Sequence, residues 1–450
     1  MSDDRPNLVL MVADDHGLHT AKYGYPSIRT PHLDALAEEG VRFTNAFCTT
    51  ASCAASRSVI LTGQYNHANG AYGHTHGRHH FSCFENVVTL PELLNRAGYH
   101  TARVGKQHYA PERLFPFKEG FPVPKFGRDD VRMSEACREL VRRDEPFFLY
   151  WCSMNPHRGG GPLTTHPCRP DRFGNPIESF PGDNEESFDD SKVVVPSFLP
   201  DTLEVRAELA QYHQSVARLD RGIGRLMQVL KEEGKYDNTV ILYISDNGMA
   251  WPSAKTTLYE PGMNLPLIVR SPFHDARDAT CDGLVTWADL TPTILDFAGA
   301  YNDTDAFHGR SFRGIIGQAS PPDWREEIYA AHTFHEITNY YPMRVVRTKR
   351  YKFIWNIAHP LTYSSASDLW HSASWQGALR DGLKTFGVRS MDAYLHRPRF
   401  ELYDLREDPN ELRNLAEAPE HAELVQSFCD KLKRFQEKTR DPWLHKWEYE

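Results

Sequence analysis

Apolar runs and stretches of helical periodicity alternate along this chain. Residues 7–13, 146–152 and 239–245 are mostly apolar and rich in branched and aromatic side chains. Runs of this length and composition are typical of parallel strands that are buried on both faces. Between residues 203 and 234, apolar side chains recur every three or four positions, which predicts a long helix crossing between two such strands. The pattern therefore predicts an α/β fold, with a large, mixed but mostly parallel sheet flanked by helices.

The pattern changes in the last quarter of the chain. Short strands are predicted at residues 351–355 and 400–403, and a closing helix at 419–439. A chain of 450 residues exceeds what one hydrophobic core usually supports. We therefore expect a catalytic domain of residues 1–340 and a smaller C-terminal α+β domain of residues 341–450 with an antiparallel sheet.

Acidic and amide side chains follow directly after two of the predicted strands. Asp14 and Asp15 end the first apolar run, and Asp246 and Asn247 end the third. Open α/β sheets bind ligands beyond the carboxyl ends of their strands, so these four side chains are expected to meet at one edge. Their oxygens suit a hard cation, for which we favour Ca²⁺ over Mg²⁺ or Mn²⁺.

Cys53 lies between the two acid pairs in the chain, at the N-terminal end of a helix predicted over residues 56–62. The free N–H groups of a helix start favour an anion. A nucleophile beside a cation and an anion site indicates hydrolysis of an anionic ester. Taken alone, a cysteine near a helix start is more often a small packing residue. The acid pairs on either side of it favour the catalytic interpretation.

Composition narrows the class of protein. Hydrophobic residues make up 40% of the chain and charged residues 25%, as in ordinary globular proteins. The net charge of -9 argues against a nucleic-acid partner. No run approaches the roughly 18 apolar residues of a membrane span, so we expect no membrane partner. The residues before the first strand show neither a basic start nor an apolar stretch, and the eight cysteines are scattered, so a cytoplasmic protein with reduced thiols is expected.

Several motifs point to one family. They comprise Cys53-Ala54-Ala55-Ser56-Arg57, Thr30-Pro31-His32-Leu33-Asp34, Leu61-Thr62-Gly63, Val104-Gly105-Lys106-Gln107-His108, Ser245-Asp246-Asn247-Gly248, Asp289-Leu290-Thr291-Pro292 and Glu401-Leu402-Tyr403-Asp404. Together they resemble the formylglycine-dependent (type I) sulfatases of the alkaline-phosphatase superfamily, and within these the sulfamidases. The resemblance implies an alkaline-phosphatase-like fold and the oxidation of Cys53 to formylglycine. Ala55 stands where the family usually has proline, which leaves open whether a formylglycine-generating or a radical maturation enzyme accepts the site.

The resemblance also implies a role for each candidate residue. The metal ligands it implies are Asp14, Asp15, Asp246, Asn247 and an oxygen of the modified Cys53. Arg57 and Lys106 would orient the aldehyde hydrate, which attacks sulfur. His157 and Lys255 would bind the sulfate and protonate the leaving atom, and His108 would take the proton that releases sulfate. Histidine fits proton transfer near neutral pH because its ordinary pKa is close by.

A sulfamidase-like stretch supplies candidate substrate contacts, namely His335, Glu336 and Arg344. Their polar groups could bind a charged sugar, because buried hydrogen-bonding groups reject ligands that leave them unpaired. The alternative for this stretch is a cluster of salt bridges between the domains.

A second stretch contains four histidines, His74, His76, His79 and His80. We reject a zinc site here, because no cysteine or acid at ligand spacing completes a soft tetrahedral set. The stretch resembles a sulfamidase segment that lines the pocket, so one of these histidines is expected to contact substrate.

We therefore expect hydrolysis of sulfate monoesters or sulfamates, such as an aryl sulfate or an N-sulfated sugar. The expected partners are a small sulfated substrate and the maturation enzyme, and a homodimer is left open. One alternative is a phosphonate or phosphate ester hydrolase of the same superfamily. The other is a non-catalytic Ca²⁺-binding homologue in which Cys53 stays a thiol.

Overall fold

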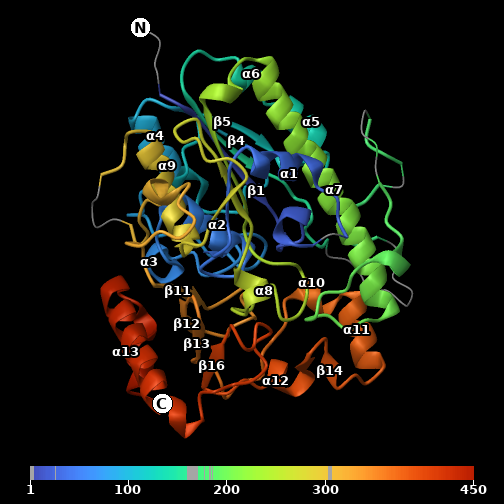
Figure 1. Ribbon diagram of the computed structural model, residues 1–450, viewed down its shortest axis with the longest axis vertical. Coiled ribbons are helices and arrows are strands. Elements are labelled where there is room, and N and C mark those ends of the chain that lie inside the picture. The colour runs from blue at the N-terminus through green and yellow to red at the C-terminus, as the bar shows by residue number, and fades with distance from the viewer. Residues whose placement is uncertain are drawn as a thin grey trace.

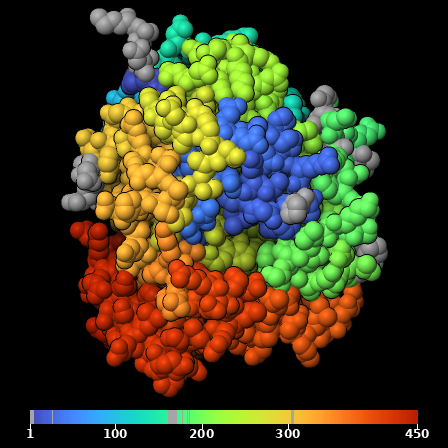
Figure 2. All heavy atoms as spheres, viewed as in Figure 1, coloured from blue at the N-terminus to red at the C-terminus, as the bar shows by residue number. Residues whose placement is uncertain are grey.

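The computed structural model describes residues 5–25, 27–159, 171–176, 178–181, 184, 186–302 and 307–449. Within them, a large sheet with helices on both faces forms the main body, and a smaller sheet with the C-terminal helix packs against one end (Figure 1). Figure 2 shows that the C-terminal residues meet the rest of the chain along a broad seam. None of the described helices combines the length and the apolar character that a membrane span requires.

The main sheet has eight strands in the described residues, in the order β5-β4-β6-β1-β7-β8-β2-β9. Their bounds in that order are Glu119–Pro122, His100–Gly105, Phe147–Cys152, Asn7–Ala13, Thr239–Ser245, Leu267–Arg270, Val41–Phe43 and Ala279–Cys281. All neighbours are parallel except β8, which is antiparallel to both β7 and β2. The predicted mixed, mostly parallel sheet is confirmed.

The central strand β1 shows why both faces carry helices. Leu8, Leu10 and Val12 lie in one hydrophobic cluster with α2, α4 and α9, whereas Val9 and Met11 lie in a second with α1, α5 and the later turns of α7. Successive strand side chains point to opposite faces, so an uninterrupted apolar run requires cover on both. The helices named here are α1 (Pro31–Glu38), α2 (Cys53–Thr62), α4 (Leu90–Arg96), α5 (Asp130–Glu135), α7 (Leu203–Glu232) and α9 (Leu290–Phe297).

The register of β1 and β7 fixes the place of the acid pairs. Ala13 pairs with Ser245 as the last residue of each strand, and the N–H of Asp246 donates to the carbonyl of Ala13 at 3.1 Å. Because the two strands are parallel and end level, the residues that follow them meet at the same edge of the sheet.

The smaller sheet is antiparallel, in the order β11-β12-β13-β16, with bounds Glu327–His332, Met343–Thr348, Tyr351–Asn356 and Phe400–Asp404. Helix α13 (Ala422–Thr439) packs against it after a 3₁₀ turn at Pro419–His421. The antiparallel sheet and the closing helix are as predicted. The first strand of this sheet, β11, lies before the predicted domain boundary at residue 340. The division of the chain into two domains stays a prediction.

The remaining described helices and strands are short. The helices are α3 (Asn66–Asn69), α6 (Arg138–Val141), α8 (Glu260–Met263), α10 (Ser367–Trp370), α11 (Ala373–Arg380) and α12 (Met391–Leu395), and the strands are β3 (Ala46–Phe47), β10 (Val285–Thr286), β14 (Thr385–Phe386) and β15 (Arg389–Ser390).

Candidate active site at the carboxyl edge of the main sheet

Three carboxylates converge where β1 and β7 end. One oxygen each of Asp14, Asp15 and Asp246 lies within 4.8 Å of the others, and all three side chains are fully buried. Asp15 adopts a left-handed backbone conformation (φ 63°), and its N–H donates to Asp246 Oδ1 at 3.1 Å. Asn247 donates from its side-chain amide to Asp15 Oδ1 at 2.7 Å. The four residues predicted to hold a cation therefore form one cluster.

The cluster fits a hard divalent cation. Asp14 Oδ1 and Asn247 Oδ1 are buried and have no hydrogen-bond partner among the described residues. Burial and the nearby charge of Asp14 raise the pKa of Asp246 to about 7, and burial also raises the pKa of Asp15. Buried carboxylates resist ionisation at this density unless positive charge is added. Unpartnered oxygens on acid and amide groups are the ligands that Ca²⁺ prefers.

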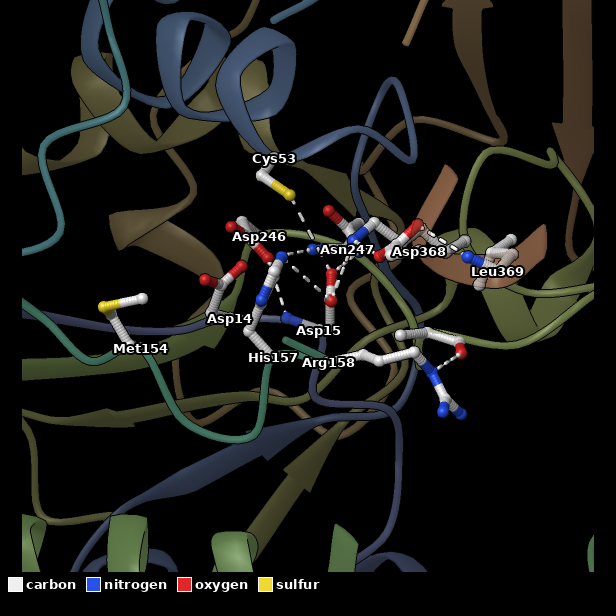
Figure 3. A network of polar contacts seen from close by, with 12 residues as sticks. Asp14, Asp15, Cys53, Met154, His157, Arg158, Asp246, Asn247, Asp368 and Leu369 are labelled. Atoms are coloured by element: carbon white, nitrogen blue, oxygen red, sulfur yellow. Dashed lines mark hydrogen bonds and ion pairs between the residues drawn. The ribbon is translucent and has the colours of Figure 1, made fainter. Parts of the chain in front are cut away.

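Cys53 is the first residue of α2, and its side chain is directed into this cluster (Figure 3). Its Sγ lies 3.9 Å from Asp15 Oδ1, and the residue is fully buried. Burial raises the pKa of the thiol well above its ordinary value, although Lys255 and Lys106 oppose this. Reactive cysteines have a lowered pKa, so the unmodified thiol is poorly suited to act as a nucleophile.

Three cationic side chains surround the acids. Arg57 Nε and Nη2 each lie 2.9 Å from Asp246 Oδ2, and Lys106 Nζ pairs with Asp14. Arg57 comes from α2, one turn after Cys53, and Lys106 follows β4 directly. Arg57 and Lys106, the two side chains predicted to orient the aldehyde hydrate, therefore lie at this edge.

Lys255 bridges two acids, one of which the sequence did not indicate. Its Nζ lies 2.9 Å from Asp15 Oδ2 and 2.7 Å from Asp368 Oδ2. Asp368 belongs to α10, and Figure 3 shows it beside the cluster. Burial would raise the pKa of Asp368, but Lys255 and His157 together lower it to about 2. An acid in the first turn of a short helix is usually a helix-start residue, so the sequence carried no signal for this role.

The two predicted proton-transfer histidines both lie near enough to Lys106 for its charge to act on them. His157 Nε2 is 3.8 Å from Asp15 Oδ2, and His108 Nε2 is 3.0 Å from His76 Nδ1. Burial lowers the pKa of His157 well below its ordinary value, with Asp14 opposing and Lys106 adding to the shift. Burial and Lys106 do the same for His108. Both rings therefore favour the neutral form, and added negative charge would help either of them to hold a proton.

Two of the three predicted substrate contacts lie next to this cluster. His335 Nδ1 is 2.9 Å from the hydroxyl of Ser52, the residue that precedes Cys53. The Glu336 carboxylate accepts from the backbone N–H of Ser367 at 3.1 Å, one residue before Asp368.

Arg344 is not brought to the site. Its Nε and Nη2 bind the carboxylate of Asp441 at 2.5 and 2.9 Å, and both side chains are fully buried. This agrees with the alternative of a salt bridge, here within the C-terminal part of the chain. We assign Arg344 no substrate contact.

Comparisons with known proteins agree with this site. The family model "Sulfatase" matches residues 6–300, and the model "N-sulphoglucosamine sulphohydrolase, C-terminal" matches residues 251–369. Human N-sulphoglucosamine sulphohydrolase is 35% identical over 97% of this chain and 91% of that protein. An ulvan-active sulfatase of Formosa agariphila is 29% identical over 94% of this chain and 78% of that protein.

Solved structures show the same fold. A protein in complex with its substrate D-glucosamine-2-N,6-O-disulfate has a TM-score of 0.70 at 21% identity, covering 97% of this chain and 99% of that one. A phosphonate monoester hydrolase of Agrobacterium radiobacter has a TM-score of 0.70 at 19% identity, covering 97% and 96%. The resemblance that the motifs indicated is thus confirmed, and this chain, with its cysteine and acid pairs at the sheet edge, is an enzyme of the sulfatase family.

Proposed function

We propose that this sulfatase hydrolyses the N-sulfate of an amino sugar, and sulfate monoesters with it, by means of a formylglycine at position 53 and a divalent cation. The observation that carries the proposal is the Asp15-Lys255-Asp368 bridge, which joins residues 251–369 to the cysteine site. That segment matches the C-terminal model of N-sulphoglucosamine sulphohydrolase. When the S–N bond of a sulfamate breaks, the leaving group is an amine, which has to be protonated. The Asp368 carboxylate offers negative charge beside His157, which would protonate that amine.

The metal residues prepare the site for an anion. Asp14, Asp15, Asp246 and Asn247 would hold Ca²⁺, and a bound Ca²⁺ would add positive charge beside the sulfate oxygens. Without it the three carboxylates would repel a sulfate. Arg57 and Lys106 offset further charge from the side of α2 and β4.

The nucleophile needs chemistry that the thiol lacks. Oxidation of Cys53 to formylglycine would supply, as the hydrate, an oxygen nucleophile at the start of α2. Cys53 is fully buried, so a maturation enzyme has to reach it before the fold closes. Arg57 and Lys106, which pair with Asp246 and Asp14, would hold the formylglycine hydrate in place by electrostatic attraction.

We assign proton transfer to His157 and His108, and sulfate binding to Lys255. The side chain of His157 is 22% exposed, so it can exchange protons with solvent while facing Asp15. A bound sulfate brings the negative charge that favours a protonated imidazole, which can then donate to the leaving nitrogen. Lys255, which like His157 approaches Asp15 Oδ2, would bind the sulfate, and His108 would accept the proton that accompanies sulfate release.

A substrate panel tests the proposal. Purified enzyme with Ca²⁺ should release sulfate from N-sulfoglucosamine and from 4-nitrophenyl sulfate, and should act poorly on phenyl phosphonate esters. Peptide mass mapping should find an aldehyde in place of the Cys53 thiol. Cleavage of aryl sulfates without any cleavage of N-sulfoglucosamine would refute the sulfamate assignment, and a wholly unmodified Cys53 in active enzyme would refute the formylglycine.

A further inference from the structure

Three histidines converge, and one of them is the proposed proton acceptor, His108. His74 and His76 come from the loop after α3, and His108 follows β4. One ring nitrogen of each lies within 4.8 Å of the other two. The three ring centroids are 4.8 to 5.0 Å apart. The zinc site rejected from the sequence rested on residues 74–80 alone, and the fold adds His108 from 32 positions beyond His76.

The spacing of the nitrogens suits one metal ion. Zinc binds histidine nitrogens at about 2.0 to 2.1 Å in tetrahedral geometry, which places two ligand nitrogens roughly 3.3 Å apart. His76 Nδ1 and His108 Nε2 are 3.0 Å apart, so a small ring rotation would bring both to a shared ion.

The rings can bind a metal once the proton shared by His76 Nδ1 and His108 Nε2 has moved to the other nitrogen of its ring. Burial lowers the pKa of His74, His76 and His108, so the rings are neutral, which is the form that binds metals. His74 is only 8% exposed, and its Nδ1 has no hydrogen-bond partner among the described residues. His108 Nδ1 also lacks a partner in that part of the chain, so it can carry the ring proton while His108 Nε2 binds the ion. An unpartnered nitrogen on a buried ring, such as His74 Nδ1, is costly unless a ligand meets it.

The donor set differs from that of the cation site at the sheet edge. Asp14, Asp15, Asp246 and Asn247 offer oxygens, whereas this cluster offers only imidazole nitrogens. Imidazole favours Zn²⁺, Cu²⁺ and Ni²⁺, and oxygen favours Ca²⁺ and Mg²⁺. His76 is exposed to solvent, so an ion can enter and keep water as a fourth ligand.

We infer that His74, His76 and His108 form a second metal site that binds a transition ion such as Zn²⁺, and that its occupancy inhibits hydrolysis. The inhibitory half rests on the proposed function, because the ion takes the lone pair with which His108 accepts a proton. The neighbouring histidines do not share the site. His79 Nδ1 accepts from the N–H of Ile337 at 3.1 Å, and His80 lies exposed outside the cluster.

Co²⁺ reports on the site directly, because nitrogen-ligated tetrahedral Co²⁺ absorbs visible light far more strongly than octahedral oxygen-ligated Co²⁺. With saturating Ca²⁺ present, the wild-type enzyme should bind one equivalent of Co²⁺ with a tetrahedral spectrum, and Zn²⁺ should displace it. His76→Asn should weaken this binding about tenfold or more. His80→Asn is the matched control, since asparagine tolerates the left-handed backbone at that position (φ 53°), and it should bind Co²⁺ like the wild type.

Inhibition is measured separately, with each variant compared with its own rate before Zn²⁺ is added. Zn²⁺ should inhibit the wild type and His80→Asn alike, and should inhibit His76→Asn only at about tenfold higher concentration or more. Equal Co²⁺ spectra or equal Zn²⁺ inhibition in wild type and His76→Asn would overturn the inference, as would displacement of Co²⁺ by Ca²⁺. If Co²⁺ binds as expected but the wild type hydrolyses no sulfate, the proposed function fails while the metal site stands.

Discussion

Replacing Asp368 by asparagine removes one of the two acids that hold Lys255. The ammonium of Lys255 lies 2.7 Å from Asp368 Oδ2, and the exposed fractions of the two side chains are 1% and 11%. At an effective dielectric constant of about 20, unit charges at this distance attract by about 6 kcal/mol. Asp15 lies within 4.8 Å of Asp368 and repels it by about 3.5 kcal/mol on the same scale. The net loss is therefore about 2 to 3 kcal/mol, at the lower end of the roughly 3 to 5 kcal/mol that removing one partner of a buried pair costs.

A double-mutant cycle measures this coupling. Asp368→Asn, Lys255→Met and the double variant are unfolded in urea at pH 7.5 with saturating Ca²⁺. The Asp15 repulsion cancels from the cycle, so the coupling energy should exceed the net cost of Asp368→Asn alone, which is about 2 to 3 kcal/mol. For a chain of 450 residues this corresponds to a fall in Tm of about 3 °C for Asp368→Asn. Asp392→Asn is the control, because the Asp392 side chain is 87% exposed and pairs only with His396 among the described residues.

Activity adds a second reading of the same variant. If Asp368 supports protonation of an amine leaving group, Asp368→Asn should reduce kcat/KM for N-sulfoglucosamine more than for an aryl sulfate. A coupling energy below about 0.5 kcal/mol would refute the buried charge pair. Equal losses on both substrates would refute the link to the amine.

Three further outcomes are expected. Cys53→Ala should abolish sulfate release while circular dichroism stays native, and more than a trace of turnover would contradict a nucleophile at position 53. His157→Asn should slow the hydrolysis of substrates with poor leaving groups about a hundredfold or more. Hydrolysis of activated aryl sulfates should slow much less, because their leaving groups need little protonation. Equal losses of rate across such a series would assign the acid role to Lys255. Burial alone would raise the pKa of Glu208, but Arg158 lowers it below its ordinary value. The Glu208–Arg158 pair therefore stabilises the fold above about pH 4.5, and this stabilisation is lost as the pH falls through the lowered pKa. Glu208→Gln should cost about 3 kcal/mol at pH 7 and should flatten this acid loss in urea titrations from pH 8 to 3, and an unchanged pH profile would speak against the pair.

The central sheet and its cluster of acids could be predicted from the sequence, because both follow from the burial and the parallel arrangement of the strands. Strands buried on both faces must be apolar throughout, so β1 and β7 are visible as uninterrupted runs, and parallel strands of equal length end at one edge. Asp14 and Asp246 follow these strands directly, and the pairing of Ala13 with Ser245 brings them together. No loop conformation had to be known.

The rest depended on contacts that periodicity does not encode. Asp368 reaches Lys255 from 113 positions further along the chain, from a helix of four residues whose path depends on the packing of the C-terminal part. Arg344 also has a partner that the sequence did not indicate, and its predicted substrate contact stays untested. It lies in a motif shared with sulfamidases, but on β12 its side chain meets Asp441, 97 positions away, rather than the cysteine site.

The charges brought together at this edge also decide which anions the site favours. Four carboxylates and three cations of the described residues meet there, namely Asp14, Asp15, Asp246 and Asp368 with Arg57, Lys106 and Lys255. With neutral histidines they sum to one negative charge, and a divalent cation brings the site to one positive charge. A monoanion then leaves the site neutral, whereas the dianion of a phosphate monoester leaves one negative charge in a buried place, which is costly. Sulfate monoesters, sulfamates and phosphonate monoesters all satisfy this balance, so the choice among them has to come from the groups around the leaving atom, for which Asp368, His335 and Glu336 are the candidates.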